Sequence, residues 1–212
     1  MTIVLAGLAA VLLPMVLDND GTPTTMAPPP ASTPAPAPPT DRGAAAGGAV
    51  PPGTTSSPEP AAPPPVGFRL HRDPTGFSIA VPNGWRAVRD GTLVDFRDPD
   101  SSRFLRIDQR SNPRGDPYDD WIGQQPEVAK RLAGYDLKRI ARVRYRGWPT
   151  ADWEFTWGSG AAPLHVLNRN VVPNQFRAYA LYWSTSDSRW AVDRELFDVI
   201  ASTFSPIARA GG

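Results

Sequence analysis

The chain contains two histidines, His71 and His165, and no cysteine. Imidazole can act as a general base or a metal ligand, but these two lack the H-x-x-x-H spacing of a helical zinc site. A nucleophile triad would also require a serine and a carboxylate beside one ring, which spacing does not test. We therefore expect no catalytic residue, no metal and no cofactor, and an exported hydrolase is kept only as an alternative.

The tripeptide His71-Arg72-Asp73 matches the start of the protein-kinase catalytic loop, H-R-D-x-x-x-x-N. Ser78 occupies the position of the metal-binding Asn, and the sequence contains neither a kinase Gly-rich loop nor a D-F-G motif. Asp73 is better explained as the first residue of a type I turn, Asp73-Pro74-Thr75-Gly76.

Arg142, Arg144 and Arg146 alternate along an expected strand, so all three are predicted to project from one face. One interpretation is an anionic contact with phospholipid headgroups, wall polymers or an acidic protein. The alternative, which we favour, is cross-strand pairing with Asp152 and Glu154 of the next strand. Nucleic acid is not an expected partner, because the domain is not strongly basic and has no recognition motif.

Tyr179 and Trp183 are the second set of candidate binding residues. They share one face of an expected strand over 176–183 with Leu181, and the opposite face is also apolar. Such a strand is either central, with helices on both sides of its sheet, or one of its faces lines a ligand groove.

Turn residues and apolar periodicity predict the elements that position these side chains. Asp116 followed by Pro117 is a helix start, Gly134 suits the end of that helix, and Pro126 predicts a kink or a break inside it. A closing helix is expected after Asp187 or Ser188, with Trp190, Phe197, Ile200 and Phe204 on its apolar face. The strands are expected over 77–81, which should be half-buried, and over 93–96, 104–107, 139–145, 151–157, 164–171 and 176–183. This order predicts an α+β fold, an antiparallel sheet with helices packed on it.

Composition divides the chain into an apolar segment, residues 1–17, a spacer, residues 18–66, a folded domain, residues 67–206, and a tail, residues 207–212. Residues 2–17 carry no charge and would span about 24 Å as a helix, slightly less than a bilayer core. We interpret them as a membrane anchor, with a cleaved signal peptide or a buried core helix as alternatives. No basic residue precedes them, which suggests that Met1 is an internal start.

The spacer holds 15 of the 26 prolines and is expected to be a disordered stalk, since it lacks the apolar side chains that would offset its ordering entropy. It carries four carboxylates against one arginine, so residues 67–212 carry a net charge of about +4. A single-pass protein of the cell membrane is the expected location, with the domain outside the cytoplasm.

Four segments carry a family resemblance: GWPTADWEFTW (147–157), LHVLNRN (164–170), YALYWST (179–185) and FDVIASTF (197–204). Together with DPTGFSIAVPNGW (73–85), they resemble the extracytoplasmic C-terminal domains of receptor-type serine/threonine protein kinases of high-GC Gram-positive bacteria. That resemblance implies a Mog1/PsbP-like fold, in which the strand over 176–183 is central, and a role in recognition rather than catalysis.

The chain has no kinase domain, which leaves two interpretations beside the exported hydrolase. One is a membrane-anchored sensor or binding module for an unknown envelope protein or ligand. The other is the C-terminal fragment of a receptor kinase whose kinase domain is missing from this chain.

Overall fold

The computed structural model describes residues 63–111, 113 and 115–206. The expected anchor, nearly all of the expected stalk and the tail lie outside these residues. Among the helices that the structure does describe, none has the length and apolar character to cross a membrane.

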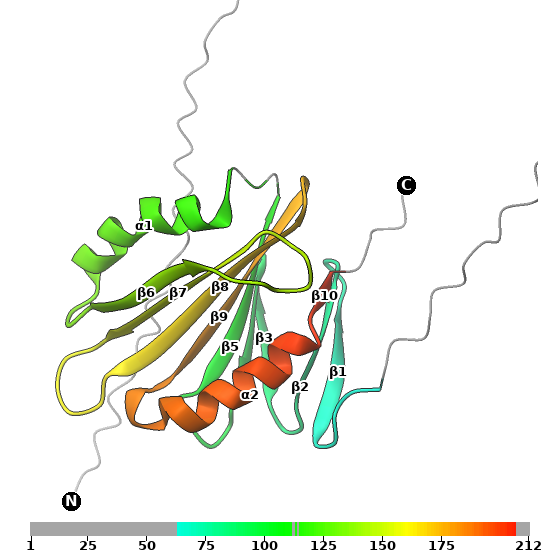
Figure 1. The fold of residues 1–212 in the computed structure, drawn as a ribbon. Coiled ribbons are helices and arrows are strands. Elements are labelled where there is room, and N and C mark those ends of the chain that lie inside the picture. Colours follow the sequence, from blue (N-terminus) through cyan, green and yellow to red (C-terminus); the bar gives the residue numbers. More distant parts are fainter. Residues whose placement is uncertain (1–62, 112, 114, 207–212) are drawn as a thin grey trace, which may run out of the picture. The chain divides into compact units, whose positions relative to one another are not determined.

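A seven-stranded antiparallel sheet forms the centre of the domain (Figure 1). Its strand order is β3-β4-β5-β9-β8-β7-β6, so β9 is the middle strand, as expected for residues 176–183. The strands are β3 (Arg86–Asp90), β4 (Leu93–Arg97), β5 (Phe104–Ser111), β9 (Arg177–Ser186), β8 (Leu164–Asn174), β7 (Thr150–Trp157) and β6 (Asp136–Arg142).

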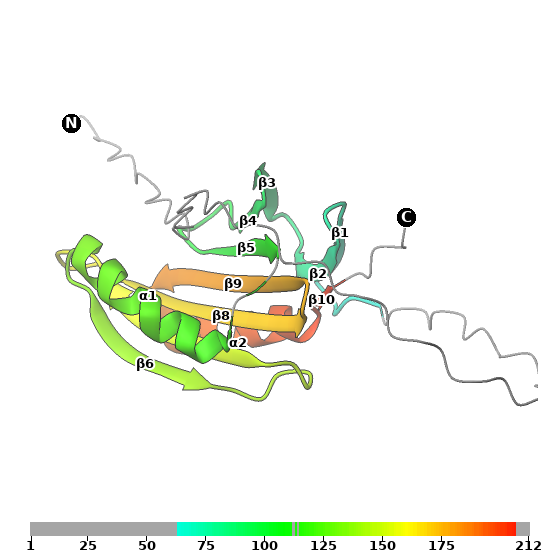
Figure 2. The same cartoon turned by 90° about the horizontal axis from the view of Figure 1, so that it is seen from above.

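A smaller sheet of order β1-β2-β10 packs beside it. It consists of β1 (Phe68–Asp73), β2 (Phe77–Pro82) and β10 (Ser205–Pro206). This sheet and helix α2 (Trp190–Ser202) cover one face of the large sheet. Helix α1 (Pro117–Arg131) covers β6, β7 and β8 on the other face (Figure 2). Two antiparallel sheets with a helix on each side confirm the α+β prediction.

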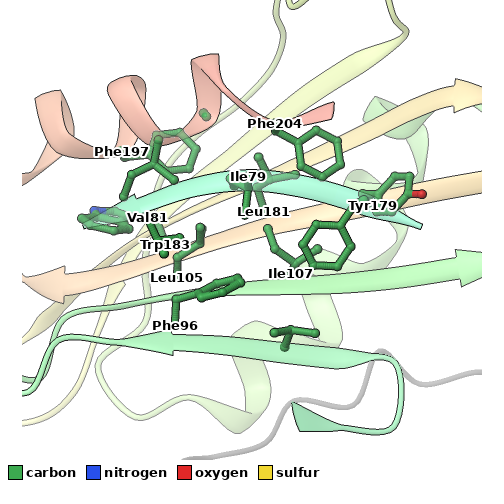
Figure 3. Packing of buried hydrophobic residues seen from close by; sticks show 14 of the residues in the cluster. Ile79, Val81, Phe96, Leu105, Ile107, Tyr179, Leu181, Trp183, Phe197 and Phe204 are labelled. Carbon is green, nitrogen blue, oxygen red and sulfur yellow. The ribbon is translucent and has the colours of Figure 1, made fainter. Parts of the chain in front are cut away.

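The core lies between the large sheet and the layer formed by α2 and the small sheet (Figure 3). Phe197 of α2 packs on Trp183 of β9 with their ring centroids 5.9 Å apart, and Phe77 of β2 packs on Phe204 at 6.1 Å. All four side chains are fully buried. Large aromatic residues therefore supply most of the contact between the layers.

Both helices begin close to the predicted positions, but their details differ. The Asp116 side chain accepts a hydrogen bond from the backbone N–H of Tyr118, which confirms the predicted N-cap. Of the kink or break predicted at Pro126, the break is wrong: α1 runs through Pro126, which is exposed, while Trp121 and Leu132 are buried on either side of it.

The closing segment starts with a 3₁₀ turn, η1 (Asp187–Arg189), and neither Asp187 nor Ser188 caps α2 itself. The N-cap of α2 is Arg189, which makes no side-chain capping bond. Phe204, expected on the helix, follows it as a buried residue before β10.

Two strand predictions are corrected. The strand β2 is buried on both faces rather than half-buried, because it lies between β1 and β10 and also packs against α2. The strand expected over 139–145 ends at Arg142, and β6 begins earlier, at Asp136, with an irregularity in register between Leu137 and Arg139. Strands β1 and β3 were not predicted from the sequence.

Candidate functional site

The imidazole of His165 lies in a buried cluster of charged groups where β8 meets the start of α2. Its Nδ1 is 2.7 Å from an Asp187 carboxylate oxygen, and its Nε2 is 3.0 Å from a Glu154 carboxylate oxygen. The ring also stacks on Trp190, the first residue of α2, with centroids 3.7 Å apart and an interplanar angle of 4°. His165 thus joins three segments, β7, β8 and the η1–α2 junction.

Glu154 is held from two sides. The hydrogen bond from His165 is the largest cause that lowers the pKa of Glu154, to about 2, and Arg139 of β6 contributes a second bond at 2.9 Å. Such perturbed carboxylates occur both in structural ion networks and at functional sites.

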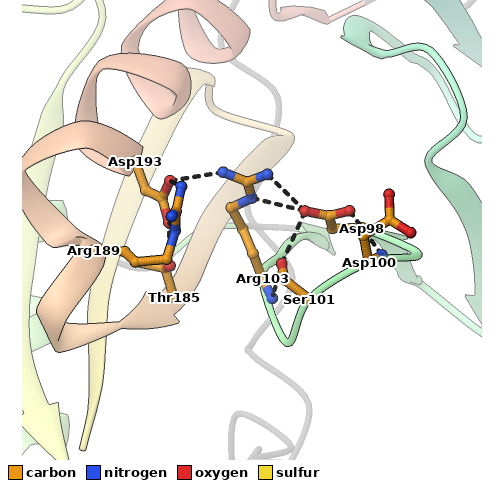
Figure 4. A network of polar contacts seen from close by, with 7 residues as sticks. All are labelled: Asp98, Asp100, Ser101, Arg103, Thr185, Arg189 and Asp193. Atoms are coloured by element: carbon orange, nitrogen blue, oxygen red, sulfur yellow. Dashed lines mark hydrogen bonds and ion pairs between the residues drawn. The ribbon is translucent and has the colours of Figure 1, made fainter. Parts of the chain in front are cut away.

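A second network fixes the next turn of α2 (Figure 4). Asp193 is fully buried and accepts hydrogen bonds from Arg103, Thr185 and Arg189. Burial alone would raise the pKa of Asp193, but these bonds and the charge of Arg103 outweigh it and lower the pKa. Arg103 also bonds Asp98, so the turn between β4 and β5 is tied to α2.

The other histidine has a structural role. His71 of β1 bonds Asp73 through Nε2 at 3.1 Å, and its ring packs on Phe96. Asp73 opens the turn between β1 and β2: Gly76 donates to its carbonyl at 3.1 Å and Thr75 donates to its carboxylate at 3.0 Å. The turn interpretation of Asp73 is confirmed. Both ring nitrogens of His165 face carboxylates, so neither is available to a serine hydroxyl as a triad requires, and His71 bonds a carboxylate through Nε2.

The three candidate arginines do not share one face. Arg142, at the end of β6, bonds Asp116 at 3.0 Å and lies over the Tyr118 ring, so it packs on the α1 side. The expected pairing with Asp152 and Glu154 is wrong for Arg142, because the shifted register places Arg139 there instead.

Arg144 and Arg146 lie beyond the strand, where alternation no longer holds. Arg144 is exposed. Arg146 has a positive φ of 53°, donates to the Ser202 carbonyl at 2.8 Å and lies over the Trp148 ring. Their role in binding remains a prediction.

Tyr179 and Trp183 lie in the core rather than at a groove. Tyr179 is 2% exposed and donates its hydroxyl to the Gly76 carbonyl at 3.0 Å, while Trp183 is fully buried and stacks on Trp85. Aromatic residues of β2 and of the α2 layer fill the space over them. Of the two alternatives for this strand, the central position is the one observed.

Sequence reasoning missed the His165 cluster, although its four members were visible in the sequence. His165 and Glu154 stand on adjacent predicted strands, and Asp187 and Trp190 flank a predicted helix start. The available signal was the alternation of side chains along the two strands, which places His165 and Glu154 on the same side of the sheet as the expected helix.

The comparison with protein families decides the identity of this fold. The model of the family described as serine/threonine kinase C-terminal domain matches residues 69–206. The chain belongs to this family. As a kinase C-terminal domain, it corresponds to a non-catalytic module of such kinases.

Two solved structures similar to this kinase C-terminal domain confirm the Mog1/PsbP-like fold, and a third shows a weaker similarity. Cyanobacterial PsbP (CyanoP) from Synechocystis sp. PCC 6803 is 20% identical with a TM-score of 0.55, covering 73% of this chain and 99% of its own. A point mutant of protein Mog1 is 8% identical with a TM-score of 0.50, covering 68% and 97% respectively. LpqN of Mycobacterium tuberculosis is 16% identical with a TM-score of 0.47, covering 66% and 90%. No curated protein sequence matches the chain.

Proposed function

We propose that this chain is a membrane-tethered, extracytoplasmic sensor or binding module that works with a serine/threonine kinase without catalytic activity of its own. The observation that carries the proposal is the family match over residues 69–206, in a chain where an uncharged apolar segment and a Pro-rich spacer precede that domain. A domain on such a stalk meets partners away from the membrane surface.

The site geometry supports a role without catalysis. Both ring nitrogens of His165 are bonded to carboxylates, so neither is free to take a proton from a substrate.

Membrane fractionation of the full chain tests the tether. We expect recovery with membranes after a high-salt wash, and the matched control is the chain without residues 1–17, which should be soluble. Recovery of the full chain as a soluble, shortened product would show instead that residues 2–17 are a cleaved signal peptide.

Arg144 and Arg146 are the residues that we propose for contact with an anionic partner in the cell envelope. Arg146 is exposed and donates a hydrogen bond to the Ser202 carbonyl rather than to a carboxylate, whereas Arg142 is neutralised by Asp116 and Asp119. The double variant R144Q/R146Q should release envelope components captured by the full chain, while R142Q should retain them. Equal retention by both variants would exclude this surface.

A kinase open reading frame directly upstream of this chain would favour the alternative of a receptor-kinase fragment.

A further inference from the structure

We propose that His165, Glu154, Asp187 and Trp190 form a proton-dependent clasp that holds the start of α2 on the sheet while the imidazole is charged and releases it when the imidazole is neutral. The clasp rests on the proposed sensor function, for which it supplies pH as the stimulus. The test of the clasp needs neither membrane location nor a kinase, so a negative result for one proposal leaves the other standing.

The positions of the two His165 ring nitrogens require that the imidazole is positively charged in the closed clasp. Both of its nitrogens lie within 3.0 Å of carboxylate oxygens, at Asp187 and at Glu154. A carboxylate only accepts hydrogen bonds, and a neutral imidazole has only one N–H to donate. The closed clasp therefore contains the imidazolium. Because His165 is only 5% exposed, a neutral ring would leave a buried nitrogen lone pair facing an oxygen, which is costly.

The surrounding charges on the sheet fix one side of the clasp. Glu154 of β7 is held by Arg139 of β6, which also lies 3.7 Å from Asp152. Lys138 of β6 is exposed; its bond to Asp136 is the main cause that raises its pKa, and the charges of Asp187 and Glu154 add to it.

The groups on the other side belong to β9 and to the η1–α2 segment. Thr185 is the residue of β9 opposite His165, and its hydroxyl is engaged by Asp193. Arg189 also bonds Asp193, so it does not compete for the carboxylates of the clasp. From α2, Trp190 presents its ring face to the imidazole, a contact that is stronger for a cation than for a neutral ring.

The bond to Asp187 is the one that should open. Glu154 keeps Arg139 as a partner and its side chain is 14% exposed, whereas the Asp187 side chain is 45% exposed and can be solvated by water. A neutral ring keeps its single N–H toward Glu154. Asp187 begins η1, so its release loosens η1 and Trp190, while Arg103 and Thr185 still hold Asp193 one turn further on.

Histidine is the side chain whose charge ordinarily changes between pH 5 and 8, so pH is the stimulus to which the clasp responds. One proton is linked to closure, so the ratio of closed to open forms falls by up to about tenfold for each pH unit above the midpoint. The start of α2 is therefore held at low pH and released as the pH rises.

The experiment is a pH titration of the full chain in detergent. At each pH, NMR records the signals of ¹⁵N-labelled histidine and tryptophan. The chain has only two histidines, so the ring signals are simple to assign with the variants H71Q and H165Q. W190F identifies the Trp190 indole signal. We expect His165 to be an imidazolium at pH 5, to lose its proton as the pH rises to 9, and the Trp190 signal to shift with the same midpoint.

The variants supply the controls. H71Q should keep the Trp190 transition and H165Q should lose it. If H165Q does not fold, D187N tests the same claim, because loss of one carboxylate partner should lower the pH midpoint of the Trp190 transition. A neutral ring throughout, a Trp190 signal that does not follow His165, or an unchanged midpoint in D187N would overturn the proposal.

Discussion

Removing the charge of Asp152 should strongly destabilise this domain. Asp152 of β7 is fully buried and forms a two-bond ion pair with Arg169 of β8, at 2.7 and 2.8 Å. The guanidinium is also enclosed by the rings of Tyr145 and Phe197, at 4.9 and 5.2 Å. Asp152→Asn keeps the shape of the side chain but leaves Arg169 as a buried cation without its main counter-charge.

Breaking one partner of a buried pair typically costs about 3–5 kcal/mol of unfolding free energy, because the remaining charge is neither hydrated nor compensated. The matched control is Glu127→Gln, since Glu127 pairs with Lys130 on the surface of α1, where the side chains are 60% and 69% exposed. Exposed pairs are screened by water and contribute little to stability. Asp152→Asn should therefore cost far more unfolding free energy than Glu127→Gln.

Urea unfolding of the full chain, followed by tryptophan fluorescence and circular dichroism, measures both values. The double variant Asp152→Asn with Arg169→Met should be less destabilised than Asp152→Asn alone, because methionine removes the stranded charge and retains the apolar contacts. A cost below about 1 kcal/mol for Asp152→Asn, or a double variant less stable than the single one, would refute this reasoning.

Three further predictions concern pH and glycine positions. The bond from His165 lowers the pKa of Glu154 to about 2, so ionised Glu154 stabilises the folded state fully above pH 4.5 and this stabilisation is lost as the pH falls toward 2. In an acid titration, the unfolding free energy of Glu154→Gln should therefore change less over this range than that of the parent chain. Burial raises the pKa of Tyr145 to about 12, so stability should fall as the pH rises from 10 to 12 in the parent chain and less so in Tyr145→Phe, by circular dichroism at alkaline pH. Gly134→Ala should lower the thermal midpoint, because φ is +65° and the new Cβ would lie 2.5 Å from a backbone oxygen. Gly123→Ala, in open space within α1, should raise it.

The apolar periodicity of the sequence limited the strand over 176–183 to two alternatives, a central strand or one wall of a ligand groove, and the family resemblance favoured the central strand. In the structure, α2 and the small sheet cover the face of the large sheet on one side of β9, while α1 lies on the other face, over β6, β7 and β8. The N-cap at Asp116 was predictable because it depends only on a hydrogen bond between residues close in the sequence.

Register and strand ends could not be predicted in this way. The irregularity between Leu137 and Arg139 changes which arginine meets Glu154, and strand β6 ends before Arg144 and Arg146. Alternation of side chains holds only while a strand continues, so three alternating arginines gave a false common face. The charged cluster at His165 depends on contacts between distant segments, which no local pattern specifies.

The boundary of the folded domain remains a prediction. Residues 67–206 should fold when they are expressed alone. Circular dichroism of this fragment should show the strand and helix content of the domain. An unfolded fragment would place the boundary elsewhere.

We propose that the domain faces the outside of the membrane as part of a kinase-linked module. Cysteine labelling in intact cells tests this location most directly. The chain has no native cysteine, so Ser102→Cys, on the exposed turn between β4 and β5, supplies one reactive thiol. Ser184→Cys, at a position 1% exposed, is the control that should react only after denaturation. A membrane-impermeant maleimide should label Ser102→Cys in intact cells, and labelling that occurs only after lysis would contradict the proposed location outside the membrane.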